Sequence, residues 1–390
     1  MNLKMKLLTA VSVMITLFVL TFFTISAGTG LAFELNAHSA ILVDAETGQV
    51  LYEENADEEL PPASLTKIMT MLLAMEAVDA GEISLEDTVT ISQSASDMGG
   101  SQIFLDAGHV LTVEELLKAV TIASANDATY ALSEAIGGTY SSFVEMMNER
   151  AEELGMENTN FTNSTGLPDE NLYTTARDVA KMSREVIKYP EIREWGQTWV
   201  EYIEVPGREI MLANLNLLVR DYPGMDGIKT GRTQEAGYCL SASAEREGAR
   251  LISVVMNADS DEERQNLTRR LLNYGFNNYI RETLLSGGET VRNIEFPGSS
   301  QGEVSALAES DLQVMVEVGS EPDFEREIVL IDDYEFPIEE GEKIGEMIVY
   351  DEYGEKLNST VLLAEDDINR AGIFSRLFRL IIDFFAGLLR

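Results

Sequence analysis

Residues 61–70 read PPASLTKIMT, and the interpretation of the whole chain starts from this stretch. The two prolines interrupt the preceding chain, so a helix is predicted to begin beside Ser64 and to extend over residues 65–80. Ser64 and Lys67 are three residues apart and share one face of that helix. Because the following residues are almost all apolar, Lys67 is expected to be buried, where a neutral lysine could take the proton of a serine nucleophile. By itself the spacing is equally typical of a capping serine and a solvated lysine.

Two further motifs follow along the chain. Ser124 and Asn126 lie in the sequence SAND between two predicted helices, where such residues are ordinary caps. Lys229, Thr230 and Gly231 lie on a predicted edge strand and are followed by Arg232. A lysine and a hydroxyl there could bind a carboxylate, and the glycine would let a substrate backbone approach. The simpler interpretation is a polar strand end with a glycine bulge.

In this order the motifs S-x-x-K, S-x-N and K-T-G resemble those of penicillin-binding proteins and serine β-lactamases. The longer stretches PPASLTKIMT, LTVEELLKAVTIASANDATYALSEAIGG and DGIKTGRTQEAGYCLSASA resemble the D-alanyl-D-alanine carboxypeptidases among the low-molecular-mass penicillin-binding proteins. The resemblance covers about residues 36–278, and the remaining layout of the chain matches the same family. It implies an α+β fold with a β-lactamase/transpeptidase-like catalytic domain, in which an antiparallel sheet carries a helical subdomain.

The resemblance also implies a role for each motif residue. Ser64 would attack the carbonyl between two D-alanines of a peptidoglycan stem peptide and form an acyl-enzyme, while Lys67 takes its proton. Ser124 would relay a proton to the leaving D-alanine, and Asn126 would hold Lys67 and the substrate amide.

The K-T-G strand is implied to bind the substrate. Lys229 would support Ser124, Thr230 would bind the terminal carboxylate, and Gly231 would admit the substrate backbone. Backbone N–H groups of Ser64 and Arg232 would form the oxyanion hole. Many relatives carry histidine where this chain has Arg232. No metal or organic cofactor is implied, and β-lactams are expected to act as covalent inhibitors.

The pattern of apolar residues predicts the arrangement of the domain. Alternation over residues 39–53 predicts a β-hairpin, and strand character returns late in the chain. The predicted strands come first along the chain, helices follow, and further strands come last. This order predicts a sheet built from distant segments, which is an α+β pattern. The predicted helices span residues 113–122, 127–136, 140–154 and 262–280, and the predicted strands span residues 199–205, 226–230, 237–245 and 251–257.

Both ends of the chain suggest a position outside the cytoplasm. Residues 1–32 begin with Lys4 and Lys6, continue with an apolar run and end in small residues, as in a signal peptide. An uncleaved signal anchor is the alternative. Residues 366–390 combine arginines with many aliphatic and aromatic residues, which predicts an amphipathic helix on the membrane surface. The alternative is a helix packed on the protein itself.

Between the two ends, we expect two domains. The catalytic domain is predicted over residues 33–283, and a small β-rich domain over residues 284–365, where short β-prone runs alternate with turn residues. The predicted location is therefore extracytoplasmic, with peripheral attachment to the cell membrane.

The composition of the chain excludes several classes of function and of site. The 390 residues carry 67 acidic and 28 basic side chains, a net charge of −39, while 45% are hydrophobic. This combination predicts a folded protein with a very acidic surface, which excludes nucleic-acid binding and suits a high-salt or alkaline exterior. One cysteine, Cys239, excludes an intramolecular disulfide. With only His38 and His109, a Cys/His zinc site is not expected, and the base for Ser64 is not expected to be histidine.

Three other functions use the same motifs. A D,D-endopeptidase would cut cross-links on the same scaffold. A class A β-lactamase needs a glutamate that activates water, yet residues 161–171, FTNSTGLPDEN, lack the expected E-x-x-L-N. A non-catalytic, penicillin-sensing protein is disfavoured because Ser64, Lys67, Ser124 and Lys229 are all intact.

Overall fold

The computed structural model describes residues 35–205, 207–320, 324–351, 354 and 356–372. The predicted signal peptide, and residues 373–390 of the predicted C-terminal helix, lie outside these ranges. Among the helices within them, none has the length and apolarity that a membrane span requires. The chain divides into a unit ending at Asn36 and a unit beginning at Ala37, and the elements below belong to the second.

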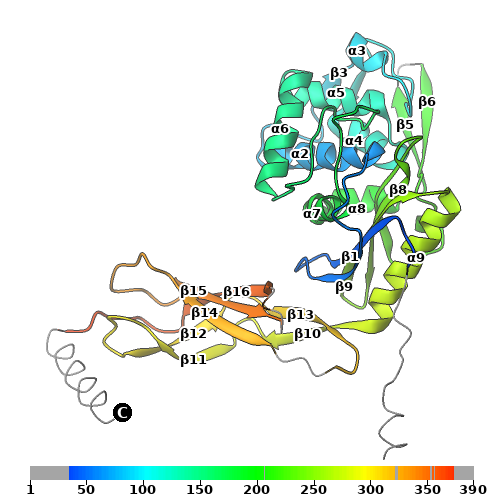
Figure 1. The fold of residues 1–390 in the computed structure, drawn as a ribbon. Helices are drawn as coiled ribbons and strands as arrows, with labels where there is room; N and C mark the ends of the chain where they lie inside the picture. The colour runs from blue at the N-terminus through cyan, green and yellow to red at the C-terminus, as the bar shows by residue number, and fades with distance from the viewer. Residues whose placement is uncertain (1–34, 206, 321–323, 352–353, 355, 373–390) are drawn as a thin grey trace, which may run out of the picture. The chain divides into compact units, whose positions relative to one another are not determined.

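A five-stranded antiparallel sheet organises the first part of this unit, in the order β2-β1-β9-β8-β7 (Figure 1). β1 pairs with β9 from Ser39↔Met256 to Asp44↔Leu251, so the sheet joins distant segments as predicted. β7, which carries the K-T-G motif, is an edge strand. The strands are β1 Ser39–Asp44, β2 Val50–Glu54, β7 Met225–Thr233, β8 Gly237–Arg246 and β9 Ala249–Ala258.

Helices form the remainder of this part. Figure 1 shows α2, α4, α5 and α6 gathered together, while α7 and α9 pack on the sheet. The predicted helices are present, whereas α3, α7 and α8 were not predicted. The helices are η1 Ala63–Thr66, α2 Lys67–Asp79, α3 Gln93–Ser96, α4 Val113–Ala123, α5 Asn126–Gly137, α6 Tyr140–Glu153, α7 Ala176–Val186, α8 Pro190–Gln197, η2 Leu217–Arg220 and α9 Asp261–Asn278.

The helix at the S-x-x-K motif begins differently from the prediction. A 3₁₀ turn, η1, contains Ser64, and the α-helix α2 starts only at Lys67. Ala63 has a φ of 47°, so the chain turns sharply just before the serine. α2 is buried on nearly every side, with Ile68, Met69 and Met71 fully enclosed, as its apolar sequence predicted.

Two short hairpins complete this part. β3 Thr88–Thr90 pairs with β4 Val110–Thr112, and β5 Val200–Val205 pairs with β6 Arg208–Ala213.

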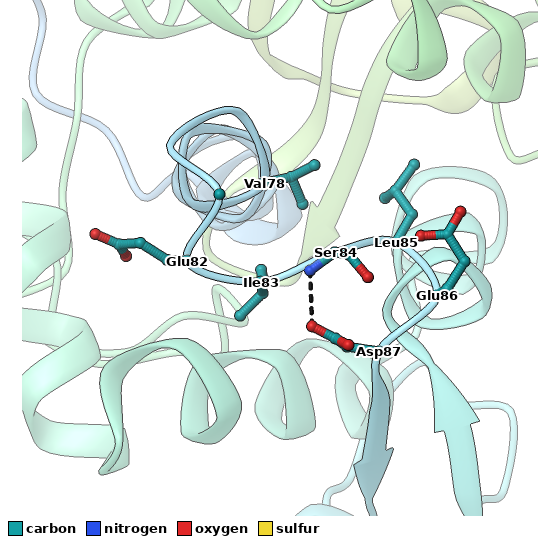
Figure 2. A pocket seen from close by; sticks show the side chains of 8 residues that line it. Val78, Glu82, Ile83, Ser84, Leu85, Glu86 and Asp87 are labelled. Atoms are coloured by element: carbon teal, nitrogen blue, oxygen red, sulfur yellow. Dashed lines mark hydrogen bonds between the residues drawn. The ribbon is translucent and has the colours of Figure 1, made fainter.

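A pocket of about 400 Å³ lies beyond the end of α2 (Figure 2). Val78, Ile83 and Leu85 line it together with acidic side chains, and the Ser84 N–H donates to the Asp87 carboxylate over 2.8 Å. No residue of the three motifs lines this pocket.

The C-terminal part is all β, which confirms the predicted fold class. β10 pairs with β13, and a five-stranded antiparallel sheet has the order β11-β12-β16-β15-β14. Phe296, Leu312 and Ile344 are among the buried residues of its own core. The strands are β10 Tyr279–Leu285, β11 Thr290–Glu295, β12 Glu303–Ala308, β13 Leu312–Glu317, β14 Glu325–Leu330, β15 Lys343–Tyr350 and β16 Lys356–Ala364.

Candidate active site

Ser64 and Lys67 lie in direct contact at the junction of η1 and α2. The Lys67 Nζ donates to the Ser64 Oγ over 3.0 Å, and Ser64 is only partly buried, so its hydroxyl has access to a substrate. Lys67 itself is fully enclosed. The pair therefore has the geometry of a nucleophile and its base.

The environment of Lys67 favours its neutral form. Burial lowers the pKa of Lys67 well below the ordinary value for a lysine, and the positive charge of Lys229 lowers it further. The Nζ also donates to the Thr165 carbonyl oxygen over 2.6 Å, a contact between residues 98 positions apart in the sequence. The carbonyl keeps the buried amine hydrogen-bonded and aimed at Ser64 without adding a carboxylate that would stabilise its charge.

Ser124 and Asn126 lie at the junction of α4 and α5. Ser124 ends α4 with a φ of 59°, and both side chains are almost fully buried. The Asn126 Nδ2 donates to the Gly99 carbonyl over 2.7 Å. The Ser124 Oγ and the Asn126 Oδ1 have no hydrogen-bond partner among the described residues. Two unpartnered polar atoms are costly in a buried site, and a bound substrate can satisfy them.

The structure differs from the role expected for Asn126. Its Oδ1 accepts nothing from Lys67, and the Thr165 carbonyl holds the lysine instead. The N-cap of α5 is Ala125, with Asn126 as the first helical residue. Sequence patterns missed Thr165 because its backbone, which carries no residue-specific signal, makes the contact.

β7 brings the K-T-G residues beside the nucleophile. A Cβ atom at Gly231 would lie 3.2 Å from the Ser64 nitrogen, closer than most real Cβ contacts, which explains the glycine. Lys229 and Thr230 are buried, and burial together with the charge of Arg264 lowers the pKa of Lys229 to about 7.

The Arg232 side chain is exposed. Its guanidinium lies over the Tyr238 ring, 5.0 Å from the ring centroid. Arg264, which sequence reasoning missed, donates to the backbone carbonyls of Gly231 and Cys239 over 3.4 and 3.1 Å. The lone cysteine, Cys239, is buried in the core.

Gly166 and Asp127 hold the surrounding backbone in place. A Cβ atom at Gly166, whose φ is 78°, would overlap the Ala63 carbonyl, so the turn after Thr165 packs directly on the chain before Ser64. The buried Asp127 carboxylate accepts backbone N–H groups of Ile103 and Leu105. Both residues lie within residues 36–278, the range that resembles the family, but nothing in their spacing indicates these contacts.

Comparison with known proteins connects this geometry to a family. The model of the family described as D-alanyl-D-alanine carboxypeptidase matches residues 25–260, and that of the penicillin-binding protein 5 C-terminal domain matches residues 279–370. The D-alanyl-D-alanine carboxypeptidase DacF of Bacillus subtilis is 40% identical over 345 residues, 88% of each chain. A D-alanyl-D-alanine endopeptidase of Pseudomonas aeruginosa is 32% identical over 243 residues, 60% of this chain and 77% of that one. The crystal structure of penicillin binding protein 5 from Haemophilus influenzae superposes with a TM-score of 0.74 at 31% identity, covering 87% of this chain and 99% of that chain.

Proposed function

The chain belongs to the D-alanyl-D-alanine carboxypeptidase family, and on that premise we propose that it removes the terminal D-alanine of peptidoglycan stem peptides through an acyl-enzyme on Ser64. The observation that carries the assignment of residues is the 3.0 Å contact between Ser64 and a fully buried Lys67. Penicillins would acylate the same hydroxyl. The enzyme is a serine-type peptidase.

The reaction has two halves. The Ser64 Oγ attacks the carbonyl between the two D-alanines while the neutral Lys67 takes its proton, and the bond to the terminal D-alanine breaks. Ser124 relays to the departing nitrogen the proton that Lys67 took from Ser64, so Lys67 becomes neutral again and D-alanine leaves with a neutral amino group. Water then attacks the Ser64 ester, which restores the hydroxyl and releases the shortened peptide.

The surroundings support binding of a peptide that ends in a carboxylate. Lys229 and Thr230 would hold that carboxylate, and the backbone N–H groups of Ser64 and Arg232 would stabilise the oxyanion. Asn126 would bind the substrate amide through its unpartnered Oδ1, which can accept a peptide N–H.

A β-lactamase is disfavoured by the partner of Lys67. Class A enzymes deacylate through a glutamate and a water molecule. Here the second partner of the lysine, beside Ser64, is the Thr165 carbonyl, and the charge that shifts the pKa of Lys67 belongs to Lys229 rather than to a carboxylate. An endopeptidase remains the second candidate, supported by the relative of that name.

D-alanine release from a stem pentapeptide tests the proposal, with a labelled penicillin as a covalent probe of the same protein. We expect both release and labelling, and the loss of both in Ser64→Ala. Labelling without release, together with cleavage of a cross-linked peptide dimer, would replace the carboxypeptidase by the endopeptidase. Release that persists in Ser64→Ala would contradict the assignment of the nucleophile.

We propose further that the protein is exported and attached to the outer face of the cell membrane through residues 366–390. Support comes from the sequence at both ends, where an apolar run follows Lys4 and Lys6 and where arginines alternate with aromatic and aliphatic residues. Deletion of residues 373–390 should move the penicillin-labelled protein from the membrane fraction to the soluble fraction. Unchanged membrane association would contradict this anchor.

A further inference from the structure

Thr70 lies three residues after Lys67 on α2, and both residues are fully enclosed. Residues three apart on a helix share one face, so the hydroxyl and the amine lie on the same side of α2. The Thr70 Oγ1 donates to the Ser164 carbonyl over 3.0 Å, and the Lys67 Nζ donates to the Thr165 carbonyl over 2.6 Å. One face of α2 therefore binds two consecutive carbonyls of a single turn, residues 163–166.

The other backbone groups of this turn are also hydrogen-bonded. The Asn163 Oδ1 accepts the N–H groups of Thr165 and Gly166 over 3.2 and 2.8 Å. The Ser164 N–H donates to the Tyr140 hydroxyl over 3.0 Å. Ser164 and Thr165 are almost fully buried, so water cannot replace a lost partner without entering the site. The position of the Thr165 carbonyl therefore depends on the bonds around it.

Two neighbouring helices support the turn from the side opposite α2. The Ser133 hydroxyl of α5 donates to the Ser164 Oγ over 2.8 Å, and both residues are fully enclosed. Tyr140 begins α6, and its ring stacks on Tyr130 with 4.1 Å between the centroids and 12° between the ring planes. The turn is thus connected to α2, α5 and α6 through side chains that the three motifs do not contain.

The Thr165 carbonyl matters because it sets the direction of the amine. A neutral lysine takes a proton through its lone pair, which must face the Ser64 hydroxyl across the 3.0 Å contact. The bond from the Lys67 Nζ to the Thr165 carbonyl restricts rotation of the amine and favours that direction. Displacement of a reacting group by about 1 Å can cost about a hundredfold in rate. A shift of the carbonyl would therefore slow proton transfer.

The charged groups near Lys67 do not supply this orientation. Lys229 reaches Lys67 from β7 as a second cation, and Arg264 of α9 acts in turn on Lys229. The buried Asp127 carboxylate of α5 accepts backbone N–H groups. Within the described part of the chain, a neutral acceptor, the Thr165 carbonyl, orients the lysine in place of an ion pair.

We propose that Thr70 is a positioning residue of the reaction: it holds the turn so that the Thr165 carbonyl directs Lys67 toward Ser64. The inference rests on the proposed function, because that function makes Lys67 the base. Thr70 acts through the turn and not on the substrate. A hydroxyl with a merely structural role would contribute to stability and leave the pH dependence of acylation unchanged.

Thr70→Val tests the proposal, since valine keeps the shape of threonine and leaves the Ser164 carbonyl without its donor. We expect the rate of penicillin acylation at Ser64 to fall about tenfold or more. Acylation needs neutral Lys67, so its rate falls on the acid side of the pH profile. That limb should move to lower pH, because a displaced carbonyl stabilises the protonated lysine less. Thr70→Ser, which retains the hydroxyl, should restore both the rate and the profile.

Thr121→Val is the matched control. Thr121 is also buried, and its Oγ1 donates over 3.1 Å to the sulfur of Met71 on α2, away from the turn. We expect its acylation rate and pH profile to be unchanged, and urea unfolding of both variants measures the structural effect separately. If Thr70→Val acylated with the rate and profile of Thr121→Val, or if Thr70→Ser were as slow as Thr70→Val, the inference would be overturned.

Tyr140→Phe tests the same turn from α6 and decides the matter if Thr70→Val does not fold. The change removes the acceptor of the Ser164 N–H, so we expect a smaller decrease in acylation rate with the same direction of shift in the pH profile. An unchanged rate and profile in Tyr140→Phe would then overturn the inference.

The unsubstituted protein separates this inference from the proposed function. If it is not labelled by penicillin and does not release D-alanine, the proposed function fails, and the premise that Lys67 is the base fails with it. If it is labelled and releases D-alanine while Thr70→Val matches Thr121→Val, only the positioning role of Thr70 is contradicted.

Discussion

At the scale of single residues, the site depends on two lysines buried side by side. Lys67 is fully enclosed and Lys229 nearly so, and each loses the hydration that a charged ammonium needs. The lost hydration makes Lys67 a base for Ser64. It also means that the folded state holds two amines that would be protonated in water. The activity of this site is therefore coupled to a cost in stability.

The pH dependence of stability should reveal the second lysine. The pKa of Lys229 is about 7 in the folded protein and about 10.4 for an unfolded lysine. Between these values the unfolded chain binds more protons, so the free energy of unfolding rises with pH. In Lys229→Met, we expect the slope to be smaller by about 1 kcal/mol per pH unit between about pH 7 and about pH 9. Urea unfolding of both proteins at several pH values measures this difference in slope. Equal slopes for Lys229→Met and the unsubstituted protein would contradict a lowered pKa of Lys229.

Gly166 provides a second test at this scale. A methyl group there would overlap the Ala63 carbonyl and displace the chain that carries Ser64. We expect Gly166→Ala to slow penicillin acylation by about tenfold or more, because small displacements of reacting groups are costly. Gly108→Ala is the control: its φ of 86° imposes similar backbone strain, but its Cβ would meet nothing within 4 Å. Equal labelling rates for the two variants would refute the packing argument.

At the scale of elements, the start of α5 is tied to the loop before it. The Asn126 backbone N–H donates to the Ser101 carbonyl over 2.7 Å, and the Asp127 carboxylate accepts from Ile103 and Leu105. These bonds position the turn that holds Ser124 and Asn126. They explain why this helix junction, whose residues are ordinary caps in the sequence, has a defined conformation.

Asp127→Asn should weaken this connection. The N–H groups of Ile103 and Leu105 share the Oδ2 oxygen, and the Ala128 N–H donates to Oδ1. An amide keeps only one acceptor oxygen, so either the Ala128 N–H or the two loop N–H groups lose their partner. We expect the free energy of unfolding to fall by about 1–3 kcal/mol and acylation by penicillin to slow.

A change at the other end of α4 separates stability from activity. The Thr112 side chain caps α4 by accepting the Glu115 N–H. Thr112→Ala should cost about 1 kcal/mol of stability without affecting acylation. If the Asp127 variant lost stability but acylated at the normal rate, the loop would have no positioning role.

At the scale of the whole molecule, charge is the dominant feature. A net charge of −39 means that carboxylates repel one another across the surface, and the 28 basic residues cannot pair with 67 acidic ones. We expect the melting temperature and the acylation rate to rise from low salt to about 1 M salt, as screening shortens the range of repulsion. Differential scanning calorimetry at increasing sodium chloride concentrations measures the melting temperature. A melting temperature that is constant or falls with salt would contradict a surface adapted to high salt.

Much of the fold could be predicted because its signals are local. The apolar face of α6 and the alternation in β1 and β2 each lie within one short segment, and the structure confirms both elements. α7 was missed although its signal is also local: Val179, Met182 and Val186 recur on one buried face, and the Thr175 side chain caps its first turn. The polar residues of ARDVAKMSREV outnumber the apolar ones, and the apolar face packs on α2 and β9. Sequence also predicted an unbroken helix from residue 65, whereas a turn at Ala63 gives η1 and then α2.

By itself, the sequence determined the set of chemical groups: a serine with a lysine three residues later, a serine–asparagine junction, a lysine–threonine–glycine strand and an acidic surface. Their periodicity and spacing are properties of contiguous residues. Only the tertiary structure decided that the Thr165 carbonyl holds Lys67 and that Gly231 brings β7 against Ser64. These contacts join backbone and side chains far apart in the chain, and the packing that creates them leaves no local pattern of residue types.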